Sequence, residues 1–113
     1  MNTANVQRYL IKALFLFLMA TAAVQYAAAD DMWIDVRSPQ EYAADHLDGA
    51  KNIPHTEIGT EIKKLNLAKD TKIKLYCRSG VRAGMAKKTL EEMGYTNVEN
   101  MGGLEDAKKA AAK

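Results

Sequence analysis

Short apolar runs alternate with longer segments in which apolar residues recur at helical spacing. The runs are rich in β-branched residues and predict strands at 32–36, 50–54, 72–77 and 96–100. The longer segments predict helices at 38–46, 56–67 and 81–94, and a polar, alanine-rich helix follows a glycine turn at 102–103. This alternation of strands and helices predicts an α/β fold, with a small, mostly parallel sheet flanked by helices.

Individual residues support two of these helices. Ser38 is suited to cap the first one, because Pro39 can occupy the first helical position and Glu41 follows three residues after the cap. In the segment 81–94, an apolar stripe is expected to pack in the core, and it consists of Val81, Met85, Leu90 and Met93.

The first 29 residues differ from the rest of the chain. Arg8 and Lys12 precede an apolar run of about a dozen residues, which is short for a membrane-spanning helix of roughly 20 residues. Ala27 and Ala29 then fit the small-x-small pattern of a cleavage site. We therefore predict a cleaved secretory signal peptide over residues 1–29 and a single domain over 30–113, exported to the periplasm. An uncleaved N-terminal anchor or a buried helix is the alternative.

Charge excludes some classes of partner. The full chain of 113 residues carries a formal net charge of +2. Cleavage would remove two of the 16 basic residues, and the remaining 14 equal the 14 acidic ones. Without a strongly basic surface we expect no nucleic-acid binding and no stable membrane association after cleavage.

The single cysteine, Cys77, lies at the end of a predicted strand in the sequence CRSGVRAG. It is a buried inert thiol, one half of an intermolecular disulfide, or a reactive thiol. In parallel α/β sheets, ligands bind beyond the carboxyl ends of the strands. A helix follows, so its first backbone N–H groups, together with Arg78 and Arg82, would form an anion-binding concavity. A thiol there is expected to have a lowered pKa and to act as a nucleophile towards an anionic substrate.

Phosphate esters, arsenate and thiosulfate are all candidate substrates. Cysteine-dependent phosphatases hold the phosphoryl group with a Cys-x5-Arg loop. In this chain Arg82 gives the spacing Cys-x4-Arg, and position 83 is alanine. The loop is thus one residue too short for a phosphatase or an arsenate reductase of that type.

The segment CRSGVR resembles the active loop of the rhodanese family of sulfurtransferases, which often reads Cys-Arg-x-Gly-x-Arg/Thr. The resemblance extends upstream through WIDVRSPQEYAADHLDGAKNIP and downstream through MGYTNVENMGGLEDA. It covers nearly all of residues 32–107, with the three blocks in the family's order.

The resemblance implies a rhodanese-like fold and a ping-pong transfer of sulfur through a persulfide on Cys77. The donor would be thiosulfate or a similar compound, and the acceptor cyanide or a thiol. It also implies substrate binding by the rest of the loop, through Arg78, Ser79, Gly80, Val81 and Arg82. An interaction module that binds a partner without turnover is the alternative.

Other polar residues are expected to support the site or to lie outside it. We expect Asp35 and Arg37 to brace the loop as an ion pair. His46 and His55 lack partners at metal-ligand spacing, so we predict no metal site and no cofactor. We expect the protein to be a monomer.

Overall fold

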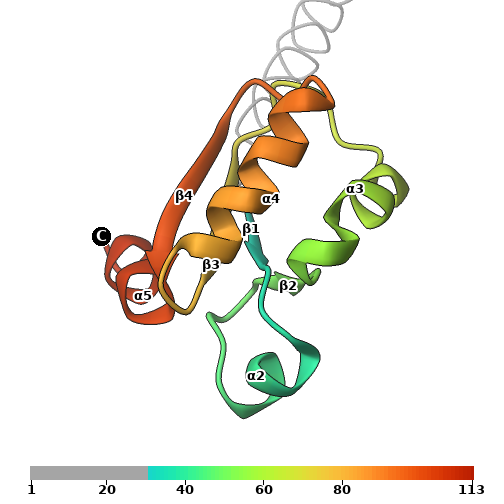
Figure 1. Cartoon of the computed structure of the whole chain (residues 1–113). Coiled ribbons are helices and arrows are strands. Elements are labelled where there is room, and N and C mark those ends of the chain that lie inside the picture. The colour runs from blue at the N-terminus through green and yellow to red at the C-terminus, as the bar shows by residue number, and fades with distance from the viewer. Residues whose placement is uncertain (1–30) are drawn as a thin grey trace, which may run out of the picture. The chain divides into compact units, whose positions relative to one another are not determined.

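The computed structural model describes residues 31–113, and the predicted signal peptide lies outside the described residues. Within them, four strands form a parallel sheet in the order β2-β1-β3-β4 (Figure 1). The strands are β1 (Met32–Asp35), β2 (Lys51–Asn52), β3 (Ile73–Cys77) and β4 (Val98–Gly103). The predicted α/β class and the parallel sheet are confirmed, and β3, which carries Cys77, is one of the two central strands.

Helices connect the strands and cover the sheet (Figure 1). The α-helices are α2 (Pro39–Ala44), α3 (Ile58–Glu61), α4 (Val81–Glu92) and α5 (Leu104–Ala111). As predicted, Ser38 caps α2: its hydroxyl accepts a hydrogen bond from the Glu41 backbone N–H, and the Glu41 side chain accepts one from the Ser38 N–H. None of the helices described in residues 31–113 has the length and apolar character needed to cross a membrane.

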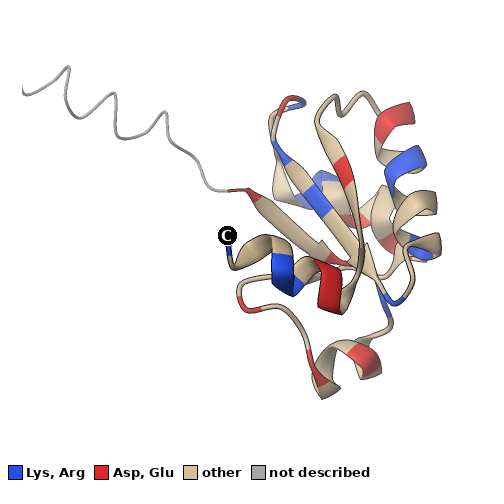
Figure 2. Cartoon of the chain, turned by 90° about the vertical axis from the view of Figure 1, so that its left-hand side faces the viewer, with Lys and Arg blue, Asp and Glu red and all other residues tan. Residues whose placement is uncertain are grey.

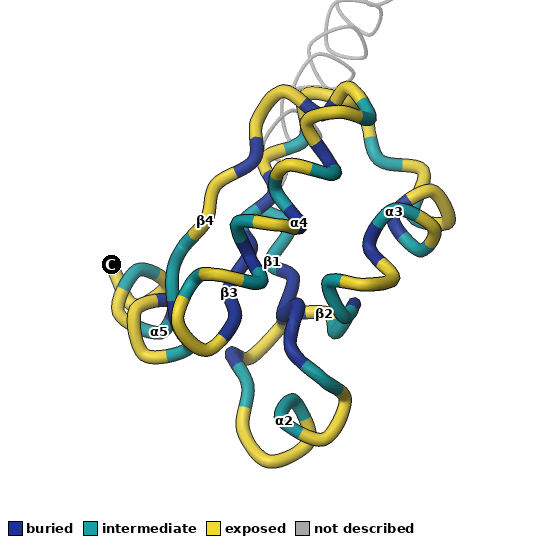
Figure 3. Tube along the Cα trace, viewed as in Figure 1, coloured by how far each residue is buried: buried dark blue, intermediate teal, exposed yellow. Residues whose placement is uncertain are grey.

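Alternation along β3 divides its buried residues between the two faces of the sheet. The buried part of the chain is concentrated along the central strands (Figure 3). Ile73, Leu75 and Cys77 pack in a cluster with residues of α3 and α4, including Ile58 and Leu90. On the opposite face, Tyr76 packs against Leu47, Ala50 and Ala107 of α5. β3 is therefore covered on both faces, and Cys77 at its end is buried.

The predicted burial of the apolar stripe of α4 is confirmed for Leu90 but is wrong for Val81 and Met85. Leu90 is fully buried, but the side chains of Val81 and Met85 are 69% and 55% exposed. The face that packs on the sheet is formed by Ala83, Ala86 and Leu90, whose spacing of three and four residues keeps them on one side of the helix. The small alanine side chains let α4 lie close to the sheet. The apolar stripe predicted from the sequence does not include them.

Two other predicted elements also differ. The helix predicted at 56–67 is broken into a 3-10 turn (His55–Glu57), the single turn α3 and a second 3-10 turn (Ile62–Leu65). Gly102 and Gly103 do not form the predicted turn but end β4, where Gly103 pairs with Cys77. An irregularity in the β3–β4 register between Leu75 and Cys77 allows this pairing.

Candidate active site

The Cys77 sulfur lies within a ring of backbone N–H groups. Cys77 is the last residue of β3 and is only 1% exposed. Its Sγ accepts hydrogen bonds from the N–H of Gly80 at 2.9 Å and of Ala83 at 3.4 Å. Because α4 begins at Val81, these donors belong to its first turn and to the residue before it. The sulfur therefore occupies the position where an anion is favoured by the free N–H groups of a helix start.

This environment favours the thiolate. Burial raises the pKa of the Cys77 thiol, but hydrogen bonding from the backbone N–H groups of four residues lowers it by more. The donors are Ala83, Ser79, Gly80 and Arg82. The pKa consequently lies below the ordinary value of a cysteine, as expected for a nucleophilic thiol.

Strand β4 fixes the shape of the loop from outside. Gly80 adopts a left-handed conformation (φ 95°), and its carbonyl accepts a hydrogen bond from the Asn100 side chain at 2.9 Å. A Cβ atom at Gly103 would lie 2.5 Å from the carbonyl oxygen of Arg78, so only glycine allows β4 to approach this closely. The loop is thus held at Gly80 and at Arg78 by neighbouring β4 residues.

Asp35 and Arg37 form the expected ion pair, which is buried at the end of β1. Arg37 donates to both carboxylate oxygens of Asp35, with Nη2 at 2.7 Å from Oδ2. Asp35 is fully buried and Arg37 is 7% exposed. The same Nη2 donates to the carbonyl of Asp45, so the pair ties the end of β1 to the segment that follows α2.

A second ion pair links α2 to the cysteine loop. The guanidinium of Arg82 donates to the carboxylate of Glu41 through two hydrogen bonds, of 2.7 Å and 3.0 Å. Arg82 and the capping-box interactions of Ser38 lower the pKa of Glu41 to about 2. Glu41 is therefore ionised under ordinary conditions, and both Arg82 terminal nitrogens are occupied.

The remaining residues of the predicted loop face solvent. Arg78, Ser79 and Val81 are exposed, and Arg78 has no ion-pair partner within residues 31–113. The structure thus places Gly80 and Arg82 close to the Cys77 sulfur. Arg78 and Ser79 lie at the exposed rim of the loop.

Known proteins with similar sequences include sulfurtransferases and rhodanese domains. The family model of the rhodanese-like domain matches residues 19–110. The chain belongs to the rhodanese family. It is 47% identical over 78 residues to thiosulfate sulfurtransferase PspE of Escherichia coli (strain K12), a match covering 69% of this chain and 75% of that protein.

Solved rhodanese structures share the fold. A rhodanese from E. coli, solved with anions, superimposes with a TM-score of 0.65 at 47% identity and covers 68% of this chain and 91% of that one. Human single-domain sulfurtransferase TSTD1 gives a TM-score of 0.62 at 23% identity, over 83% of this chain and 93% of that one. The second likeness supports the fold alone.

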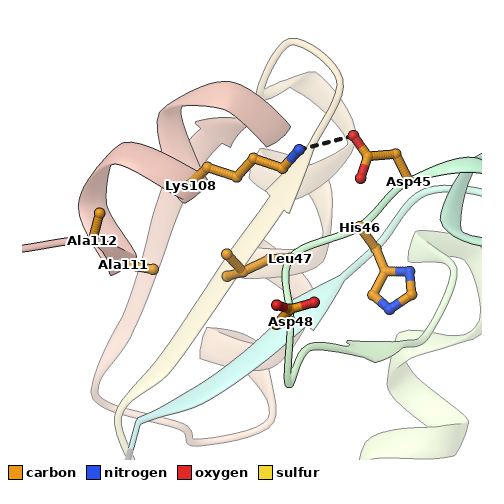
Figure 4. A pocket seen from close by; sticks show the side chains of 7 residues that line it. All are labelled: Asp45, His46, Leu47, Asp48, Lys108, Ala111 and Ala112. Atoms are coloured by element: carbon orange, nitrogen blue, oxygen red, sulfur yellow. Dashed lines mark hydrogen bonds and ion pairs between the residues drawn. The ribbon is translucent and has the colours of Figure 1, made fainter.

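The two described pockets of this rhodanese domain do not include Cys77 among their lining residues. One, of about 560 Å³, lies between α5 and the segment after α2, where Lys108 reaches Asp45 at 2.8 Å (Figure 4). Within residues 31–113 no group of three His, Cys, Asp or Glu side chains is placed to hold a metal. The polar contacts to the Cys77 sulfur come from backbone N–H groups of its own loop and of the start of α4.

Three contributions to the site were missed in the sequence. The sequence predicts Glu41 as part of the helix cap and of the family resemblance, but it does not predict the ion pair of Glu41 with Arg82. Asn100 and Gly103 act on the loop from β4, and their effect depends on strand pairing across more than twenty residues. No local pattern in the sequence indicates such contacts.

The buried ion pair provides a test of the bracing role. The change Asp35→Asn leaves Arg37 buried without its counter-charge, and we expect it to lower the free energy of unfolding by about 3–5 kcal/mol. Chemical denaturation would measure the loss. The matched control is Asp45→Asn, which removes the exposed pair with Lys108 and should change stability little. Equal effects of the two changes would contradict a structural role for Asp35.

Proposed function

We propose that this rhodanese is a thiosulfate sulfurtransferase that carries sulfur as a persulfide on Cys77. The observation that carries the proposal is the Cys77 sulfur, buried and held by backbone N–H groups of its own loop. The same groups would stabilise negative charge on a sulfur atom bound to Sγ. The 47% identity to a thiosulfate sulfurtransferase supports the same reaction.

In the first half-reaction the Cys77 thiolate attacks the outer sulfur of thiosulfate. A bond forms between Sγ and that sulfur, the sulfur–sulfur bond of thiosulfate breaks, and sulfite leaves with the bonding electron pair. The product is an anionic Cys77 persulfide. The attacking species is the thiolate, and the backbone N–H groups that lower the pKa of Cys77 favour this form.

In the second half-reaction an acceptor attacks the terminal sulfur of the persulfide. With cyanide the products are thiocyanate and the Cys77 thiolate, so the enzyme returns to its starting state. A thiol acceptor would react in its thiolate form and leave as a persulfide. The covalent intermediate divides one difficult transfer into two displacements.

Roles for the loop residues follow from their positions. Gly80 supplies a backbone donor, and Ser79 is placed at the rim to supply another. Arg78 is exposed and can contact the oxygens of thiosulfate directly. Arg82 adds positive charge near the sulfur while its terminal nitrogens bind Glu41, and Val81 begins the helix that presents the N–H groups. Asp35 and Arg37 would support the site indirectly, by tying the end of β1 to the segment after α2.

Intact mass spectrometry tests the persulfide. Incubation of the reduced protein with thiosulfate should add ~32 Da, one sulfur atom, and cyanide should then remove it. The Cys77→Ala variant should show no gain and no production of thiocyanate. Folded wild-type protein without a mass gain would contradict the proposal and favour a binding module without turnover.

We also propose that residues 1–29 direct export and are removed, so that the enzyme acts in the periplasm. The support is the basic start, the short apolar run and the Ala27/Ala29 pattern. The N-terminus of the protein expressed in a bacterium should begin at or within about two residues of Asp30, in the periplasmic fraction. An intact N-terminus in the cytoplasmic fraction would contradict export.

A further inference from the structure

Three arginines lie in or next to the cysteine loop, and two of them are neutralised by a carboxylate. Arg37 binds Asp35 at 2.7 Å, and Arg82 binds Glu41 at 2.7 Å. Arg78 is the only one of the three without an ion pair to residues 31–113. Basic and acidic residues are also interspersed along the ribbon in Figure 2. The positive charge offered to an incoming anion is therefore smaller than the three arginines in the sequence suggest.

Glu41 is the carboxylate that neutralises Arg82 of the cysteine loop. It is held in place by more than Arg82, because its Oε1 also accepts hydrogen bonds from the backbone N–H and the hydroxyl of Ser38. The carboxylate thus has a fixed position at the start of α2 and binds both terminal nitrogens of Arg82. Arg82 in turn interacts electrostatically with Cys77.

A fixed carboxylate at this place has a predictable effect on substrates. Each additional negative charge on a donor is attracted by Arg78 and Arg82 but repelled by Glu41. At the same distance, the repulsion energy between Glu41 and a monoanion is half of that between Glu41 and a dianion such as thiosulfate. We propose that Glu41 is a specificity-determining residue that weakens the binding of dianionic sulfur donors and shifts selectivity towards donors with a single negative charge. This inference rests on the proposed function.

Donor kinetics of Glu41→Gln test the inference. Glutamine is isosteric, and its amide oxygen in the place of Oε1 can still accept hydrogen bonds from Arg82 Nη1 and Ser38, so that only the bond from Arg82 Nη2 is lost. The donors are thiosulfate, a dianion, and benzenethiosulfonate, a monoanion that gives up its outer sulfur and leaves as benzenesulfinate. We expect KM for thiosulfate to fall about three- to tenfold at low ionic strength, and KM for benzenethiosulfonate to fall about two- to threefold. The value of kcat should change less than KM.

Two controls separate charge from structure. Glu41→Asp keeps the negative charge and should keep the wild-type preference between the two donors. Added salt should reduce the difference between wild type and Glu41→Gln, because exposed charges are screened. Equal changes in KM for both donors, or a rise in KM for thiosulfate in Glu41→Gln, would overturn the inference.

A binding measurement keeps the test independent of turnover. In a Cys77→Ala background, thiosulfate can bind without reacting, and calorimetry would compare its affinity with and without Glu41→Gln. Tighter binding in the double variant supports the inference even if wild-type protein fails to form a persulfide, and unchanged or weaker binding overturns it. The failure of the proposed function is seen separately, as wild-type protein that takes up no sulfur from thiosulfate.

Discussion

The reactivity proposed for Cys77 depends on hydrogen bonds from backbone N–H groups to its sulfur. A buried thiol without such donors would have a raised pKa and would be a poor nucleophile. Here the donors outweigh burial, because β3 ends at the cysteine and α4 begins four residues later. Backbone groups are held by the fold itself, so the environment of the sulfur is fixed before any substrate arrives. In the proposed reaction the same donors stabilise first the thiolate and then the persulfide.

The rest of the domain keeps this loop in shape. From one side, β4 contacts the loop through Asn100 and through the close approach of Gly103. From the other side, the Asp35–Arg37 pair fixes the end of β1, and Glu41 connects α2 to Arg82. These contacts come from segments far apart in the chain, so the environment of Cys77 depends on tertiary structure.

Local signals in the sequence predicted much of this. The alternation of apolar runs predicted the parallel α/β fold, and the Ser38–Glu41 pattern predicted the cap of α2. The position of Cys77 between a strand and a helix predicted the backbone N–H groups beside its sulfur. The failures involved tertiary contacts. Val81 and Met85 appeared to continue an apolar stripe, but the sheet packs against Ala83 and Ala86. Glu41, which forms an ion pair with Arg82 of the loop, lies 41 residues before it in the chain. Sequence spacing does not predict a contact between residues so far apart.

Titration of the Cys77 thiolate tests the central claim most directly. The ultraviolet absorbance of the thiolate would be followed against pH in the purified reduced protein, with Cys77→Ala as the blank, since Cys77 is the single cysteine. The account predicts a pKa below the ordinary value of a cysteine thiol, because backbone donors favour the charged form. A pKa at or above the ordinary value would show that burial dominates, and it would contradict the account of how this loop activates sulfur.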